Sequence, residues 1–179
     1  MANLYSPCET TQESRLTQVT IDPAIFRQVL GSYPTGVCVI SALGAGGKPV
    51  GMVVGTFTSV SLDPPLVGFL PDKNSSTWPK IEAAGRFCVN VLASDQQEIS
   101  RQISGKGTEK FIGVDFAISD HQLPVIANAI ACIECTIHST TDAGDHWLVL
   151  GNVLRLETTR EGDPMLFYRG KYGGFAETR

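Results

Sequence analysis

The sequence has few of the side chains that enzymes use for hydrolysis or for binding metals. Its 179 residues include only three histidines, His121, His138 and His146, and no His-x-x-x-His pair. The Gly-x-Ser-x-Gly motif of hydrolases and the cysteine–histidine spacings of zinc sites are absent as well. The Gly-x-Gly-x-x-Gly fingerprint is also missing, so any dinucleotide would have to bind without a Rossmann domain.

Charge and hydropathy exclude two further classes of protein. The formal net charge is −4, whereas nucleic-acid binding needs clustered lysine and arginine. No apolar run approaches the roughly 20 residues that cross a bilayer. Residues 1–20 are polar and lack the pattern of a secretory signal. We therefore expect no nucleic-acid partner, no membrane association, a flexible N-terminal arm over residues 1–20 and a single domain over residues 21–179.

The five cysteines are odd in number and lack the spacing of a disulfide framework. They are Cys8, Cys38, Cys88, Cys132 and Cys135. Cys132 and Cys135 lie in a segment that alternates with period two, and strand residues three apart point to opposite faces. The two sulfurs should therefore diverge, and we predict no metal site. Reduced thiols favour a cytoplasmic location.

The pattern of apolar residues predicts a mainly β fold with a few short helices, and no internal repeat is present. We expect strands at residues 37–40, 48–55, 66–70, 87–91, 129–141, 147–157 and 165–168, with residues 51–61 forming one or two strands. Expected helices cover residues 23–30, 78–84 and 94–102. Strands outnumber helices about two to one, which indicates a small antiparallel barrel with helices at its ends.

The first helix has clear boundaries and an apolar face. Asp22 is a good N-cap and Gly31 a good end signal. Ile25, Phe26, Val29 and Leu30 recur at helical spacing, so we expect this face to pack into the core.

The segment 51–67 has an unusual composition for a core strand. Hydroxyl-bearing residues alternate with apolar ones up to Ser61, and Asp63-Pro64-Pro65 then forces a bend. Exposed amides and hydroxyls in such a strand suit a flat ligand with a polar edge. A solvated edge strand explains the same composition.

A second polar cluster precedes the helix at 78–84. Asn74, Ser75, Ser76 and Thr77 are all possible caps, and their amides and hydroxyls would suit a phosphate, although ordinary capping needs only one of them. The glycine- and lysine-containing segment 104–110 follows later as either a flap over phosphates or a solvated loop.

Six segments together resemble the short-chain flavin reductase family, the reductase components of two-component flavin monooxygenases. They are Gly51–Val67, Ser32–Val37, Arg86–Leu92, Lys110–Val114, Gly144–His146 and Phe167–Tyr172, within residues 22–174. The resemblance implies the split β-barrel, a Greek-key antiparallel barrel, usually as a homodimer with flavin near the subunit interface. It also implies FAD or FMN as cofactor, NADH or NADPH as hydride donor, and a separate monooxygenase as partner.

The same resemblance implies a set of site residues. The flavin contacts would be Thr35, Val53, Val54, Gly55, Thr56, Ser59, Val60, Ser61, Asn74, Ser75, Ser76, Thr77, Phe87, Lys110 and Phe111. His146, the one residue to which we assign a catalytic role, would contact the nicotinamide, with Arg169, Gly170 and Tyr172 at the edge of its pocket. An alternative interpretation is that His146 and Arg169 are ordinary surface residues. Thr35 can equally be a turn residue whose hydroxyl bonds its own backbone.

The chain departs from the family pattern at Val53 and Gly55, where members often carry a hydroxyl or an amide. Backbone contacts must replace those side chains, or flavin is held loosely as a diffusible substrate. Three hypotheses remain at this point: a flavin reductase, a non-catalytic flavin- or heme-binding split barrel, and an interaction barrel without a cofactor.

Overall fold

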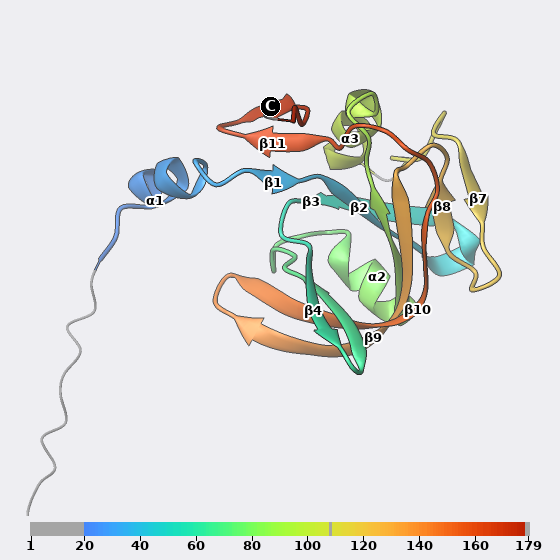
Figure 1. Ribbon diagram of the computed structural model, residues 1–179. Helices are drawn as coiled ribbons and strands as arrows, with labels where there is room; N and C mark the ends of the chain where they lie inside the picture. The colour runs from blue at the N-terminus through green and yellow to red at the C-terminus, as the bar shows by residue number, and fades with distance from the viewer. Residues whose placement is uncertain (1–19, 108, 178–179) are drawn as a thin grey trace, which may run out of the picture.

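The computed structural model describes residues 20–107 and 109–177 (Figure 1). Cys8 and the arm predicted over residues 1–20 lie outside the described residues, apart from Thr20. Within those residues the helices are α1 (Pro23–Leu30), α2 (Trp78–Ala84) and α3 (Gln97–Ser104), with a 3-10 turn, η1, at Ala45–Gly47. The strands are β1 (Thr35–Gly36), β2 (Cys38–Leu43), β3 (Pro49–Val54), β4 (Thr58–Leu62), β5 (Pro65–Phe69), β6 (Arg86–Val91), β7 (Phe116–Ile118), β8 (Pro124–Ile126), β9 (Ala131–Ala143), β10 (His146–Thr158), β11 (Leu166–Tyr168) and β12 (Lys171–Gly173).

The largest sheet is antiparallel and strongly curled. Its strand order is β3-β2-β6-β9-β10-β5-β4, so β3 and β4 lie at opposite edges. Only residues 55–57 separate these two strands in sequence, and four extended residue steps span at most about 14 Å. The two edges must therefore approach each other. No ladder joins β3 to β4 among the described strands, so the prediction of a mainly β, antiparallel fold is confirmed without a closed barrel.

Helix α2 fills the space that the curled sheet encloses (Figure 1). Trp78 and Ile81 are buried on α2, and the ring of Trp78 meets Phe69 edge to face at 5.8 Å. Phe69 in turn meets Phe87 at 5.1 Å. The helix ends at Ala84, as predicted, and Gly85 follows in the left-handed conformation, which glycine adopts without a steric penalty.

Helix α3 and the β7–β8 hairpin cover another part of the sheet, where Val39, Ile103 and Phe111 belong to a second apolar cluster. The spacing of Ser94 and Gln97 is that of a capping box and predicts a helix start at residue 94, but the helix starts three residues later, at Gln97, so this prediction was wrong. The side chain of Gln96 instead folds back and accepts a hydrogen bond from the amide of Ala93 at 3.1 Å.

Two other predictions need correction. The strand expected at residues 165–168 was predicted to close the main sheet, but β11 pairs with β1 and β12 in a separate three-stranded sheet. The limits of α1 are confirmed, and Asp22 caps it by accepting a hydrogen bond from the amide of Ala24 at 2.7 Å. Its apolar face is not in the core, however, because α1 projects away from the sheets (Figure 1). The exposed fractions of its apolar residues are 55% for Ile25, 53% for Phe26, 61% for Val29 and 54% for Leu30.

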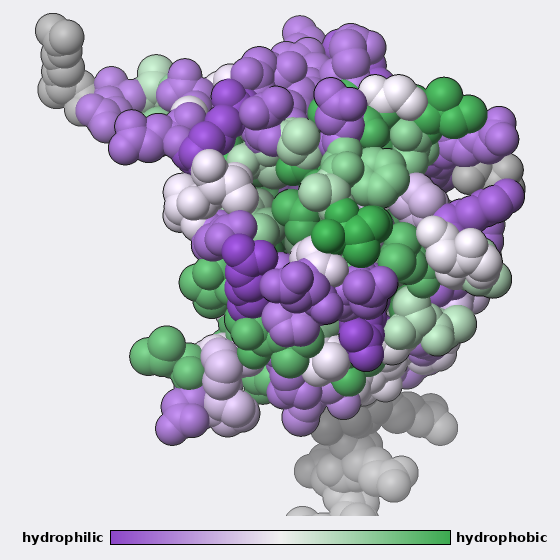
Figure 2. Space-filling model, turned by 90° about the vertical axis from the view of Figure 1, so that its right-hand side faces the viewer, coloured by the Kyte–Doolittle hydropathy of each residue, from purple (hydrophilic) through white to green (hydrophobic). Residues whose placement is uncertain are grey.

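Apolar surface is also exposed on the body of the protein. Leu62 on β4 and Leu154 and Leu156 on β10 are exposed. Figure 2 shows apolar side chains gathered in the middle of the face seen from the right of Figure 1, bordered by polar ones. No helix among the described residues is long and apolar enough to cross a membrane.

The prediction that the sulfurs of Cys132 and Cys135 on β9 diverge is confirmed. Cys135 packs in the main core with Phe87, whereas Cys132 packs in a separate cluster with Cys88 and Leu123, so the two thiols lie on opposite faces. Burial raises the pKa of Cys135 to about 12, with a further contribution from the charge of Glu134.

Glu134 is a fully buried carboxylate on β9. It accepts hydrogen bonds from Ser119 Oγ at 2.6 Å and Arg155 Nη1 at 3.2 Å, and His121 Nδ1 lies 2.9 Å from it. Burial alone raises the pKa of Glu134, but these hydrogen bonds outweigh burial and hold its pKa below the ordinary value.

Candidate functional site

A narrow apolar slot of about 180 Å³ lies where β1 meets the end of β3. It is lined by Thr35, Val37, Val53, Val54, Gly55, Phe167 and Tyr172. A Cβ atom placed on Gly55 would lie 2.7 Å from Thr35 Oγ1, closer than real contacts allow. Glycine is therefore what lets these two strands approach while the slot stays open. Thr35, Val53, Val54, Gly55 and Tyr172 were all predicted site residues, and the fold brings them together.

A larger hollow of about 720 Å³ adjoins the slot, and Val53 lines both. Three segments supply its other walls: Met52 on β3, the loop with Asp72 and residues 74–77, and the end of α3 with the residues that follow it. Its described lining residues are Met52, Val53, Asp72, Asn74, Ser75, Ser76, Thr77, Ile103, Ser104, Gly105, Lys106, Gly107 and Lys110.

The loop before α2 is held by its own side chains. Asp72 Oδ1 accepts a hydrogen bond from the amide of Asn74 at 2.6 Å. Ser75 Oγ accepts from the amides of Thr77 and Trp78, each at 3.2 Å, and thereby caps the start of α2. Hydrogen bonds to the backbone thus account for Ser75. Thr77 occupies the N-cap position of α2, but its side chain makes no capping hydrogen bond, and it lines the hollow together with Asn74 and Ser76.

Lys110 faces this polar loop. Its Nζ donates to Thr77 Oγ1 at 3.4 Å, and the side chain of Gln102 holds the carbonyl of Lys110 at 3.0 Å. Burial lowers the pKa of Lys110, and the nearby charge of Lys80 lowers it further. An anion in the hollow would offset both effects, because it stabilises the charged form of the amine.

A third hollow, of about 790 Å³, lies on the other side of the slot, and Tyr172 lines both. The described residues around it are Ser32, Pro34, Leu166, Tyr168, Arg169, Lys171, Tyr172, Gly173 and Gly174. The hydroxyl of Tyr172 lies 2.9 Å from Ser100 Oγ on α3, which fixes the ring between the two spaces. Val53 and Tyr172 therefore place the slot next to both larger hollows.

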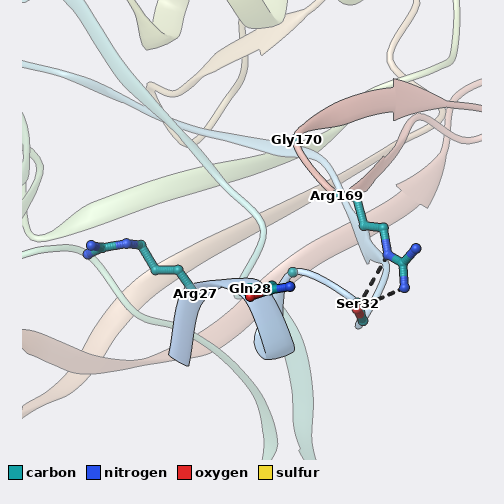
Figure 3. A pocket seen from close by; sticks show the side chains of 6 residues that line it. Arg27, Gln28, Ser32, Arg169 and Gly170 are labelled. Carbon is teal, nitrogen blue, oxygen red and sulfur yellow. Dashed lines mark hydrogen bonds between the residues drawn. The ribbon is translucent and has the colours of Figure 1, made fainter. Parts of the chain in front are cut away.

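Arg169 and Gly170 also line a hollow of about 450 Å³ between α1 and the turn joining β11 to β12 (Figure 3). The guanidinium of Arg169 donates to Ser32 Oγ at 3.3 and 3.4 Å and lies 5.1 Å from the ring centroid of Tyr168. Figure 3 shows Arg27 pointing away from Arg169, so these two cations do not converge on one ligand.

His146 begins β10 and is half-buried, with Nδ1 lying 2.7 Å from Asp145 Oδ1. Its backbone pairs with Asp72, which places it beside the hollow lined by residues 74–77. Arg169, Gly170 and Tyr172 line the third hollow or its neighbour instead. His146 itself lines none of the hollows described above, so the structure does not bring it into one pocket with Arg169.

Six further predicted residues also line none of these hollows; they are Thr56, Ser59, Val60, Ser61, Phe87 and Phe111. Phe87 is fully buried and packs against Phe69, so its side chain serves the core. Phe111 packs against Phe116 at 5.5 Å and fills the space beside Gly51. Thr56 exchanges hydrogen bonds with the backbone of Leu70.

The residues at 59, 60 and 61 lie on the edge strand β4, where the ladder to β5 shifts register between Ser59 and Ser61. Sequence reasoning missed several lining residues, among them Asp72 and Phe167. Asp72 follows Pro71 directly after a predicted strand, at the point where the run of polar residues begins, and this position was the available signal.

Comparison with known proteins identifies the family of the chain. The family model "Flavin reductase like domain" matches residues 30–176. A flavin reductase of Pseudomonas putida is 50% identical over 167 residues, covering 93% of this chain and 98% of the relative. The reductase subunit of a flavin-dependent monooxygenase of Rhodococcus jostii is 42% identical, over 93% of this chain and 85% of its own.

The solved structures give the same result. The nitrilotriacetate monooxygenase component B homolog of Mycobacterium thermoresistibile superposes with a TM-score of 0.82 at 44% identity, covering 86% of each chain. An NADH:FAD oxidoreductase of Streptomyces globisporus, solved in complex with NAD and FAD fragments, has a TM-score of 0.80 at 35% identity, covering 88% of this chain and 97% of its own. The chain described here therefore belongs to the flavin reductase like domain family.

Proposed function

We propose that the protein is an NADH-dependent flavin reductase that reduces FAD or FMN and releases reduced flavin to a separate flavin-dependent monooxygenase. The observation that carries the proposal is that the apolar slot at Gly55 and the hollow that contains Lys110 are neighbours, with Val53 lining both. A planar ring with a phosphate-bearing tail requires this combination of surfaces. The names of the relatives, among them an NADH-dependent FMN reductase of Agrobacterium fabrum at 42% identity, support the same activity.

The residues around the slot suit an isoalloxazine ring. Val53 and Val54 offer apolar walls, and the bare backbone at Gly55 leaves its amide available to the polar edge of a ring. When bound, the flavin supplies the hydride acceptor and the nicotinamide supplies the donor. The task of the protein is then to hold the two rings in contact, which requires no titrating side chain in the slot.

The neighbouring hollow suits the phosphates of the flavin. Lys110 and Lys106 provide positive charge, and Asn74, Ser76 and Thr77 provide polar groups opposite them. These charged and polar groups would bind the phosphates of FMN or FAD. Riboflavin has no phosphate, so phosphate-bearing flavins should bind more tightly than riboflavin.

His146 is proposed to contact the nicotinamide nucleotide from beside this hollow. Its Nδ1 is engaged by Asp145, which leaves Nε2 for a ligand. We expect His146→Ala to raise the KM for NADH and to leave flavin affinity nearly unchanged. His138 is exposed on β9 and provides a matched control, since His138→Ala should change neither value. An unchanged KM in His146→Ala would remove this residue from the site.

We also propose that the curled sheet is a split barrel and that the chain forms a homodimer. The apolar face of α1, more than half exposed, supports the dimer. Isolated helices of eight residues are unstable in water, so the conformation of α1 needs a packing partner. Light scattering should give about twice the 19.2 kDa mass of the chain.

The proposed activity is tested by following NADH oxidation in the presence and absence of FAD, FMN and riboflavin, with NADPH as a parallel donor. Oxidation that requires added flavin supports a reductase. A protein that binds flavin and turns yellow without oxidising either nucleotide would be a non-catalytic flavin-binding member of the fold, and the proposal would be wrong.

A further inference from the structure

Residues 71–73 form a short extended segment along the beginning of β10. The amide of Trp147 donates to the carbonyl of Pro71, and the amide of Lys73 donates to the carbonyl of Asp145, both at 2.9 Å. Between them Asp72 pairs with His146 in an antiparallel bridge. The turn of the β9–β10 hairpin, which carries His146, is therefore attached to the loop before α2.

The side chain of Lys73 strengthens this attachment from both strands of the hairpin. Its Nζ forms an ion pair with Asp142 at the end of β9 and lies 4.6 Å from the ring centroid of Trp147 on β10. Asp142 and Trp147 are directly opposite each other in the β9–β10 register. Asp142 Oδ1 also accepts a hydrogen bond from the amide of Gly144 at 3.2 Å, so the same carboxylate organises the turn.

Lys73 lies between the residue that pairs with the hairpin and the first residue of the polar wall of the hollow. On one side of it, Asp72 pairs with His146. On the other side, Asn74 begins the polar wall of the hollow that contains Lys110. Asp72 Oδ1 accepts a hydrogen bond from the amide of Asn74, so the residue paired with His146 and the first residue of the polar wall are held together.

We propose that Lys73 is a positioning residue, whose ammonium group holds the hairpin that carries His146 against the loop that lines the phosphate hollow. Through this contact the nicotinamide and flavin subsites keep a fixed relation to each other. The inference rests on the proposed reductase function. Lys73 lines none of the hollows described above; it acts through Asp142 and Trp147.

The energetics separate this role from general stability. The side chain of Lys73 is 28% exposed and that of Asp142 is 69% exposed. Partly exposed ion pairs add little to the stability of the whole fold. The backbone hydrogen bonds of residues 71 and 73 survive when the ammonium is removed, so the chain should fold normally. Loss of the ammonium group should instead make the turn of the β9–β10 hairpin more mobile.

The kinetic test compares Lys73→Met, Lys73→Arg and the control Lys48→Met, which alters an exposed lysine beside η1. Lys73→Met should raise the KM for NADH about fivefold. This is the fold-change that corresponds to losing the combined free energy of a partly exposed ion pair and a cation–π contact. The kcat and the melting temperature should stay near wild type. Lys73→Arg should restore most of the KM, since it keeps the charge. An unchanged KM in Lys73→Met, or an equal rise in Lys48→Met, would overturn the proposal.

A second measurement does not depend on catalysis. Hydrogen exchange followed by mass spectrometry should show faster exchange of the peptide covering residues 142–147 in Lys73→Met, and wild-type exchange in Lys48→Met. Asp142→Asn should resemble Lys73→Met, and the double variant should be no worse than either, because both changes break one interaction. Unchanged exchange in Lys73→Met would refute the positioning role. Absence of flavin-dependent NADH oxidation in the wild type would refute the proposed function instead.

Discussion

The contact between β1 and the end of β3 gives a sharp prediction for Gly55→Ala. An added Cβ would lie 2.7 Å from Thr35 Oγ1 and 3.4 Å from Thr35 Cβ, so Thr35 or its strand must move. Gly55 is not among the residues with positive φ, so alanine suits its backbone and the whole effect comes from the contact. The displaced atoms would narrow a slot of only about 180 Å³.

Overpacking of this kind costs about 1–3 kcal/mol. If the cost falls on the flavin-bound form, the Kd for flavin should rise by about 5- to 150-fold. Quenching of flavin fluorescence on titration with protein measures this Kd directly. The NADH oxidation rate at saturating flavin should change much less, because the reacting rings are still held once flavin is bound.

Two further variants make the reasoning refutable. Thr35→Ala in the Gly55→Ala background removes the oxygen that the new methyl group meets, so it should recover most of the affinity relative to Thr35→Ala alone. Gly162→Ala is the control, since a Cβ there would meet nothing closer than 3.8 Å. Wild-type flavin affinity in Gly55→Ala, or failure of Thr35→Ala to recover it, would show that the slot is not where the ring binds.

Three other predictions test other parts of the structure. Lys110→Met should raise the KM for FMN and FAD about tenfold and leave riboflavin unchanged, because only the former carry phosphate; an equal effect on riboflavin would contradict this. Glu134→Gln should destabilise the fold by about 2 kcal/mol, or lower the Tm by about 6 °C, at neutral pH. The pKa of Glu134 is lowered on folding, so its contribution to the free energy of unfolding is present above the ordinary carboxylate pKa and is lost as pH falls through the pKa of the folded state. The difference in stability between Glu134→Gln and wild type should therefore shrink in acid. A difference in calorimetric stability that stays constant with pH would refute this. Val29→Asp, on the exposed face of α1, should shift the mass measured by light scattering from dimer to monomer, and an unchanged dimer would show that α1 lies outside the interface.

The parts of the fold that sequence could predict are set by local chemistry. Asp22, Gly31 and Gly85 act on their own helix ends, so the limits of α1 and α2 were correct. The β9–β10 hairpin was equally accessible, because two alternating segments flank a turn with Gly144 in a positive-φ conformation.

The failures arise from contacts between distant segments. The apolar stripe of α1 indicates that something covers it, but not that it lies away from the core of its own chain. Alternation shows that Phe87 faces an apolar environment, yet only the packing against Phe69 places it in the core rather than at a ligand. Lys73 was not identified because its partner Asp142 lies 69 residues away in sequence.

The most direct test of the account is the dependence of NADH oxidation on added flavin. With FAD or FMN present, the purified protein should oxidise NADH at a rate proportional to protein concentration, and without flavin the rate should fall to background. Absence of flavin-dependent oxidation with FAD, FMN and riboflavin alike would contradict the claim that the slot and hollows around Val53 bring a flavin and a nicotinamide together.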